Sequence, residues 1–204
     1  MIKLVKMTWY ACILIMLMGC NDNTPDDFAL EQSQNVYHAE ALEFCKANGL
    51  NTSFYYLVDF RFHSGKKRFF VYDFSQEKAI KKGLVTHGSC DIFEDNYTKY
   101  EQVKFSNTES SHCSSVGKYK IGARDYSSWG INVKYWLHGL DTTNNNAKDR
   151  IVVLHSWSVV DDEEIYPDYS ALSWGCPAVS DNFMRELDTQ LKSCSKPVLL
   201  WVIG

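Results

Sequence analysis

The spacing of apolar residues changes along the chain and divides it into helical and extended parts. Residues 28–48 carry apolar positions at helical spacing and are followed by Gly49, which predicts one amphipathic helix. Residues 181–193 show the same spacing and predict a second helix. The intervening chain and the last segment are rich in aromatic and β-branched residues, as in strands. The apolar face of the first helix contains Val36, Ala39, Leu42 and Phe44, and strands are predicted at 54–61, 68–74, 80–87, 116–122, 131–138, 151–157 and 197–203.

These elements predict a mainly β (α+β) fold with flanking helices. Residues 63–66 have the composition of a hairpin turn between the first two strands. Two long polar stretches, 90–115 and 161–172, are predicted as loops. Loops of that length usually carry function, so we expect them near a site.

The N-terminus has the layout of an export signal. Two lysines precede an apolar run over residues 7–18, and Gly19 and Cys20 follow it. The run is short for a transmembrane span, although it could serve as an uncleaved anchor. Residues 17–20 resemble a bacterial lipobox, which implies cleavage after residue 19 and lipidation of Cys20. We therefore expect a protein of the cell envelope or periplasm, tethered to a membrane by lipid at Cys20, with residues 21–27 as a flexible tether.

Charge narrows the class of partner. Removal of residues 1–20 takes away two of the 21 basic residues and none of the 25 acidic ones, so the formal charge changes from −4 to −6. An acidic chain without a basic stripe argues against binding to nucleic acid. The remaining length suits one domain with its own core.

Cysteine usage predicts one free thiol. Seven cysteines are present, of which Cys12 leaves with the signal and Cys20 is the lipidation site. Five remain, so an odd one is left if the others pair, and we expect it to be Cys176. We favour bridges Cys90–Cys113 and Cys45–Cys194, but three connectivities are open for four cysteines, and the alternative is that none pair. The absence of Cys-x-x-Cys and of His-Glu-x-x-His argues against a zinc site, so neither metal nor cofactor is expected.

The most specific motif is Ser-Trp-Gly-Cys-Pro-Ala at 173–178, with His155 at the end of the apolar run 151–154. Glycine permits a close backbone approach and proline fixes the following φ, so the motif predicts a rigid turn that presents Cys176. A histidine held by a strand can take the proton of a thiol. The competing interpretation is that Cys176 is a small core residue and His155 a satisfied edge histidine.

Residues 54–204 resemble the YkuD-like L,D-transpeptidases of bacterial cell walls, in particular the subgroup with the core Ser-x-Gly-Cys-Pro-Ala. The resemblance implies a YkuD-like β-sandwich or mixed sheet, preceded here by an N-terminal helix within 28–53. The matching segments, in the order of the family, are 58–60, 68–73, 87–88, 105–107, 114–117, 139–141, 146–147, 150–155 and 173–178.

The resemblance implies acyl transfer through a thioester. Cys176 would attack the carbonyl between the diamino acid and D-Ala of a peptidoglycan stem peptide, and His155 would act as base and then as acid. Pro177 has no amide hydrogen, so we assign the oxyanion to the amides of Cys176 and Gly175. Ser173, or a carbonyl beside it, is the candidate to orient the far nitrogen of His155.

The chain departs from the wider family on both sides of the cysteine. Ala178 and Trp174 stand where arginine and histidine are common, so we assign anion binding to Arg150, whose alternative is a solvated charge at a strand start. We expect Trp174, His87, Ser106 and Asn107 to bind substrate. A capped structural role for His87 is an equal alternative, and the other hydroxyls of 106–115 are expected to serve turns.

Three functions follow from these residues. The first is an L,D-transpeptidase that cross-links stem peptides. The second is an L,D-carboxypeptidase or endopeptidase with the same cysteine and histidine, in which water accepts the acyl group. The third is a wall-binding lipoprotein without turnover, which a disulfide-bonded or buried Cys176 would favour. The oligomeric state is left open.

Overall fold

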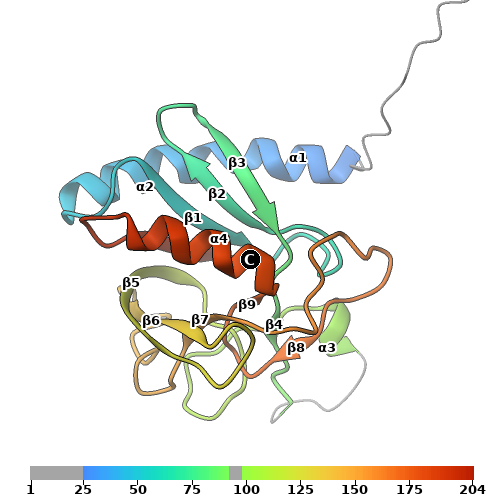
Figure 1. Cartoon of the computed structure of the whole chain (residues 1–204). Coiled ribbons are helices and arrows are strands. Elements are labelled where there is room, and N and C mark those ends of the chain that lie inside the picture. The colour runs from blue at the N-terminus through green and yellow to red at the C-terminus, as the bar shows by residue number, and fades with distance from the viewer. Residues whose placement is uncertain (1–24, 92–97) are drawn as a thin grey trace, which may run out of the picture.

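The computed structural model describes residues 25–91 and 98–204 (Figure 1). The predicted signal, Cys20 and residues 21–24 lie outside this part. Its helices are α1 (Pro25–Ser33), α2 (Asn35–Ala47), α3 (Thr98–Glu101) and α4 (Asp181–Lys192). Its strands are β1 (Phe54–Asp59), β2 (Phe69–Asp73), β3 (Lys78–Gly83), β4 (His87–Gly88), β5 (Gly117–Tyr126), β6 (Val133–Gly139), β7 (Val153–Ser156), β8 (Leu172–Ser173), β9 (Ala178–Val179) and β10 (Leu199–Ile203).

One large sheet organises the molecule. Eight strands pair in the order β3-β2-β1-β10-β5-β6-β7-β9, and β4 pairs with β8 in a separate small sheet. The C-terminal strand β10 lies between β1, to which it is parallel, and β5, to which it is antiparallel. The expectation of a mainly β fold with a mixed sheet and flanking helices is confirmed.

Helices cover the two faces of the sheet unequally. On one face Phe183, Met184 and Leu187 of α4 pack into the main core. On the other face α2 covers a second core formed with β1, β2 and β10. In Figure 1, α4 lies in front of the sheet while α1 and α2 run behind it. Among the described residues this second core contains none from β6 or β7, so that part of the face is left for other contacts.

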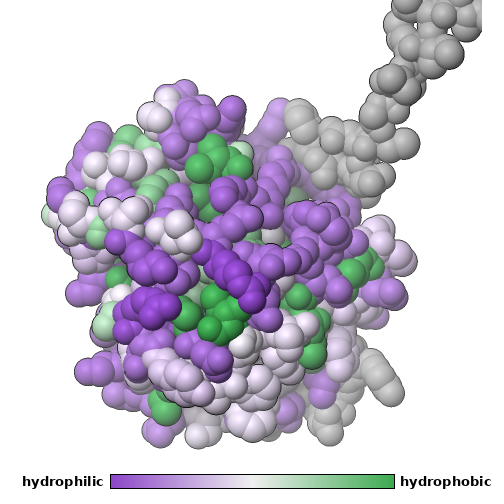
Figure 2. Space-filling model, in the orientation of Figure 1, coloured by the Kyte–Doolittle hydropathy of each residue, from purple (hydrophilic) through white to green (hydrophobic). Residues whose placement is uncertain are grey.

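The surface over α4 is polar. Figure 2 shows a largely hydrophilic face in which apolar atoms form small, separate patches.

Helix α4 begins after Ser180, whose Oγ accepts a hydrogen bond from the Phe183 amide at 3.2 Å, as an N-cap does. Its bounds agree with the predicted helix to within one residue.

The N-terminal helical region differs from the prediction in two ways. It forms two helices separated at Gln34, and the buried positions of α2 are Ala41 and Cys45. Val36 and Ala39 of the predicted apolar face are exposed. The apolar face of the helical region was misplaced because Gln34, although polar, is buried. Its Nε2 donates a 2.9 Å hydrogen bond to Asp59, which satisfies the buried amide.

The predicted tether is shorter than expected. Residues 25–27 already belong to α1, and Asp27 is buried in an ion pair with Lys66. The first helix is therefore fixed to the loop that follows β1. None of the helices in residues 25–91 and 98–204 is long and apolar enough to cross a membrane.

All seven predicted strand segments contain strands, and the turn at 63–66 is confirmed by the bond from the Lys66 amide to the His63 carbonyl. The segment 80–87 is divided between β3 and β4. The prediction missed β8, β9 and α3, which have two, two and four residues. Segments this short contain too few positions to show a period.

The cysteine prediction is half right. Cys90 and Cys113 form a disulfide, while Cys45, Cys176 and Cys194 are free. The expected bridge between Cys45 and Cys194 is wrong because the sheet separates the two thiols. Cys45 belongs to the core under α2, whereas Cys194 packs against the core under α4.

Candidate active site

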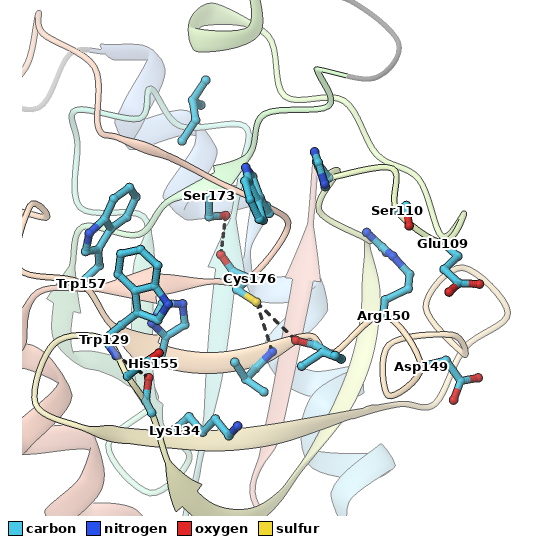
Figure 3. Close-up of a pocket in the computed structure, with 17 residues that line it drawn as sticks. Glu109, Ser110, Trp129, Lys134, Asp149, Arg150, His155, Trp157, Ser173 and Cys176 are labelled. Carbon is cyan, nitrogen blue, oxygen red and sulfur yellow. Dashed lines mark hydrogen bonds between the residues drawn. The ribbon is translucent and has the colours of Figure 1, made fainter.

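A cavity of about 720 Å³ opens on the part of the sheet that α2 leaves uncovered (Figure 3). Its lining combines Cys176 with residues from β6, β7 and β8 and from the loops at 109–112, 127–129 and 149–151. Figure 3 shows Cys176 between a group containing His155 and two tryptophans and a group of charged residues. The lining includes Trp129, Lys134, His155, Trp157, Ser173, Trp174, Cys176, Glu109, Ser110, His112, Asp149, Arg150 and Ile151.

Strand alternation places the cavity residues on one side of the sheet. On β6, Val133, Tyr135 and Leu137 enter the main core, so Lys134 projects to the opposite face. Its register partner on β7 is His155, which in turn is paired with Ala178 of β9. The predicted imidazole therefore comes from β7 and the predicted thiol from the turn that leads into its neighbour β9, and both line one cavity.

The turn before Cys176 is fixed by close contacts. Gly175 has φ +99°, and a Cβ added there would lie 2.5 Å from the carbonyl oxygen of Cys113. The Ser173 hydroxyl donates to the Cys176 carbonyl at 2.7 Å and accepts from the Gly175 amide at 3.2 Å. The disulfide-linked loop and the cysteine turn thus pack against each other, which only glycine permits.

Thr86, which the sequence did not single out, holds the other side of the turn. Its buried hydroxyl donates to the Cys176 carbonyl at 3.1 Å and accepts from the Ala178 amide at 3.0 Å. The Cys176 carbonyl is therefore held by two hydroxyls. This fixes the backbone on which the thiol is mounted.

The thiol of Cys176 is free and contacts backbone atoms of the strand start. Its Sγ lies 3.5 Å from the Val153 amide and 3.6 Å from the Ile151 carbonyl oxygen. Burial raises the pKa of Cys176, whereas the Val153 amide and the Arg150 and Lys134 charges lower it by less. The resting thiol is consequently neutral near neutral pH, in contrast to the ionised sulfur that a neighbouring imidazolium would favour.

His155 is held in one orientation by its own backbone neighbour. Its Nδ1 lies 2.9 Å from the carbonyl oxygen of Ser156, so Nδ1 carries the proton and Nε2 has a free lone pair. The Ser156 carbonyl thus orients the ring of His155, a role that we expected for Ser173 or a carbonyl beside it. Burial lowers the pKa of His155, so the imidazole is neutral at neutral pH. Among the described residues the thiol is hydrogen-bonded to backbone rather than to this ring.

Arg150 lines the cavity, but both Nη atoms of its guanidinium are already bonded to the protein. Nη1 donates to the Ser106 carbonyl at 2.8 Å and to the Ser115 hydroxyl. Nη2 donates to the Cys113 carbonyl at 2.6 Å and to the Ser111 hydroxyl at 3.2 Å. The side chain thus uses its Nη donors to hold the loop that packs on Gly175.

His87 is not placed to bind substrate, which corrects its expected role. The ring is fully buried, with Nδ1 at 2.9 Å from Arg68 Nη2 and Nε2 at 2.8 Å from the Lys99 carbonyl. Arginine only donates, so Nδ1 accepts and Nε2 donates. The structural alternative is the right one for this histidine.

Ser106 and Asn107, which we expected to bind substrate, do not line the cavity. Ser106 receives Arg150 at its carbonyl, and its hydroxyl accepts from the Thr108 amide at 3.1 Å. Asn107 donates to the Thr142 carbonyl at 3.2 Å. These side chains hold turns, whereas Ser110 of the same loop lines the cavity.

Trp174 lies at the cavity rim with 74% of its surface exposed. Its ring stacks on His112, with centroids 4.8 Å apart and planes at 10°. His112 in turn lies 2.7 Å from Asp91. On the opposite side of the cavity, near His155, the ring centroids of Trp129 and Trp157 lie 5.5 Å apart (Figure 3). Within the described part of the chain, no three histidine, cysteine or acidic side chains gather as a metal ion would require.

We expect alkylation of Cys176 by iodoacetamide to accelerate with pH, with a midpoint above that of an ordinary cysteine. The reason is that burial raises the pKa of this thiol and no imidazolium opposes it. The measurement is the alkylation rate between pH 6 and 10, with the Cys176→Ser protein supplying the background from Cys45 and Cys194. A midpoint below neutral pH would show a resting thiolate and contradict this prediction.

We also expect acid to destabilise the fold through His87. Burial lowers the pKa of His87 to about 3, and the neighbouring Arg68 charge contributes. The unfolded histidine titrates near 6.5, so below that pH the unfolded state binds a proton that the folded state excludes, and stability is lost as pH falls toward 3. At pH 5 the loss from His87 is about 2 kcal/mol.

Denaturant unfolding at pH 7.5 and pH 5.0 measures this loss. The His87→Gln protein, which lacks the titrating group, should show a smaller difference between the two pH values than the wild type. An equal difference in both proteins would assign the acid sensitivity to other groups, such as His38, whose pKa burial lowers to about 4.

Comparison with known proteins gives one family. The model of the L,D-transpeptidase catalytic domain matches residues 29–199. Solved structures with this likeness include the helical cell shape determining protein Pgp2 from Campylobacter jejuni, at 13% identity over 73% of this chain and 49% of that one, with a TM-score of 0.44. Another is an L,D-transpeptidase from Mycobacterium smegmatis, at 13% identity over 74% of this chain and 59% of that one, with a TM-score of 0.42. The chain thus spans about half the length of these proteins, and no curated protein matches it.

Proposed function

Since this chain belongs to the family of L,D-transpeptidase catalytic domains, we propose that it is a cysteine L,D-transpeptidase acting on peptidoglycan stem peptides through a thioester on Cys176. The observation that carries the proposal is the position of the free Cys176 thiol in one cavity with His155, whose Nε2 is left able to accept a proton. Cys176 is not disulfide-bonded and lines a cavity, which favours an enzyme over a wall-binding protein without turnover.

The first half of the reaction forms the acyl-enzyme. The Cys176 sulfur attacks the carbonyl carbon between the diamino acid and D-Ala, while its proton moves to Nε2 of His155. A carbon–sulfur bond forms and the carbonyl oxygen becomes an oxyanion. His155 then returns the proton to the D-Ala nitrogen as the carbon–nitrogen bond breaks, which leaves a thioester and free D-Ala.

The second half uses an amine. The amine of another stem peptide gives a proton to His155 and attacks the thioester, and Cys176 leaves with that proton. Since His155 is neutral at rest, it can act as base in both halves without prior deprotonation.

The oxyanion requires a donor near the thiol. The Gly175 amide is committed to the Ser173 hydroxyl, whereas the Cys176 amide has no partner among the described residues. We therefore assign the Cys176 amide to the oxyanion and give Gly175 the role of permitting the turn. Ser173 and Thr86 are positioning residues, because both act on the Cys176 carbonyl.

The surroundings of the enzyme follow from the N-terminus. We propose export to the cell envelope or periplasm, with cleavage before Cys20, lipidation of that cysteine and insertion of the lipid into a membrane. With α1 starting at Pro25, only a short segment would separate the lipid from the folded domain. Labelling of the protein, but not of a Cys20→Ala variant, by a lipid precursor tests this anchor.

Product analysis on a defined disaccharide tetrapeptide tests the proposed activity. We expect a cross-linked dimer and free D-Ala in equal amounts. Tripeptide and D-Ala without dimer would favour the carboxypeptidase with the same site, and no product would contradict both enzymes.

A further inference from the structure

Lys134 brings a positive charge into the cavity beside His155. The two residues are register partners on β6 and β7, and both line the cavity with Cys176 (Figure 3). The Cβ atoms of such partners lie about 4.5–5.5 Å apart on the same face of a sheet. The ammonium is close enough to contribute to lowering the pKa of His155.

The contacts of Lys134 leave room for a second anion. Its Nζ lies 3.7 Å from Asp125 and 4.8 Å from the ring centroid of Trp136. The Asp125 carboxylate already accepts bonds from the Tyr126 amide at 2.7 Å and the Trp136 indole at 3.1 Å, and half of its side chain is exposed. The ion pair is thus longer than a hydrogen bond and open to water.

The other charged groups of the cavity are less suited to an anion. Arg150 donates to four oxygens of the disulfide-linked loop. Glu109 and Asp149 line the same side as Arg150 in Figure 3 and would repel a carboxylate. A carboxylate entering the cavity is therefore favoured on the Lys134 side.

The proposed reaction places a carboxylate on that side. The departing D-Ala takes its proton from Nε2 of His155, so its nitrogen must lie next to that ring. Its carboxylate is attached to the carbon bonded to this nitrogen. We propose that Lys134 binds the terminal carboxylate of the departing D-Ala, and so makes the site specific for the free C-terminus of a tetrapeptide.

This inference rests on the proposed function and adds a specificity residue to it. The ammonium of Lys134 forms an ion pair and exchanges no proton. An acceptor amine that bears a carboxylate on its own α-carbon would occupy the same place, because it must give its proton to the same nitrogen. The amine at the D-centre of a diamino acid and the amine of a free D-amino acid meet this description.

The test compares two substrates that differ only at the C-terminus. One is the disaccharide tetrapeptide ending in D-Ala, and the other is the same compound ending in D-alanine amide. For wild type we expect kcat/KM to be about 10- to 100-fold lower with the amide, as for loss of a charged hydrogen bond. The Lys134→Met protein should lose this preference, because its kcat/KM should fall for the substrate ending in D-Ala and stay the same for the amide. The Lys134→Arg protein should keep part of the preference.

The matched control is Lys120→Met, which removes an exposed lysine of the neighbouring strand β5 and should leave both rates unchanged. Equal losses on both substrates in Lys134→Met, or no preference in wild type, would overturn the role of Lys134. Acylation of Cys176 by a carbapenem is measured on the same proteins. If wild type is neither acylated nor active on either substrate, the proposed function fails and the inference fails with it.

Discussion

Replacement of Cys176 by serine is expected to lower turnover of the tetrapeptide by on the order of 10³-fold or more, while the protein stays folded. A serine hydroxyl needs a much stronger base than a thiol does. Burial holds the pKa of His155 below its usual value, so this imidazole is a weaker base than a solvated one. The measurement is release of D-Ala and formation of dimer under single-turnover conditions.

Stability separates this effect from unfolding. Serine is nearly isosteric with cysteine and its hydroxyl faces an open cavity, so the melting temperature should change little. Cys194→Ser is the matched control, because it removes a free thiol on the other side of the sheet. Retained turnover in Cys176→Ser would remove this cysteine from the mechanism.

Removal of the imidazole in His155→Ala is expected to slow acylation by about 10²- to 10⁴-fold with little change in substrate binding. The thiol keeps its backbone contacts in this variant, but no group takes its proton. The readouts are the acylation rate and the substrate Kd. Added imidazole should restore part of the rate through the space that the side chain leaves.

His138→Ala is the control for His155, since it removes a half-buried histidine from β6 that does not line the cavity. The residual reaction of His155→Ala should depend more steeply on pH, because only the pre-ionised thiolate can attack. Unchanged acylation kinetics in His155→Ala would exclude it as the base.

The elements that could be predicted are those with enough residues to show a period. The strands at 54–61, 68–74 and 197–203 are three neighbouring strands of the large sheet, and their aromatic and β-branched residues fill both cores. The helix α4 has a clear apolar face and a capping serine. The face of α2 was misplaced because Gln34 and His38 are satisfied by tertiary hydrogen bonds, which no local pattern reveals.

The cysteine turn was visible because its residues are contiguous. Lys134 and Trp129 line the cavity and Thr86 holds the cysteine turn, and all three were missed because strand pairing and loop packing bring them there from distant parts of the chain. The only available signal for Lys134 was a lysine flanked by apolar residues in a strand, which alternation alone would place on the open face. The prediction for Cys45 and Cys194 failed because spacing along the chain does not show which face of a sheet each thiol occupies.

Mass spectrometry of the intact protein, quenched in acid during reaction with a disaccharide tetrapeptide, is the most direct test of the thioester on Cys176. We expect a mass gain equal to the substrate minus D-Ala, located on Cys176 by peptide mapping and removed by hydroxylamine. Continued product formation with no adduct on Cys176 at any quench time, and with equal turnover in Cys176→Ser, would contradict it.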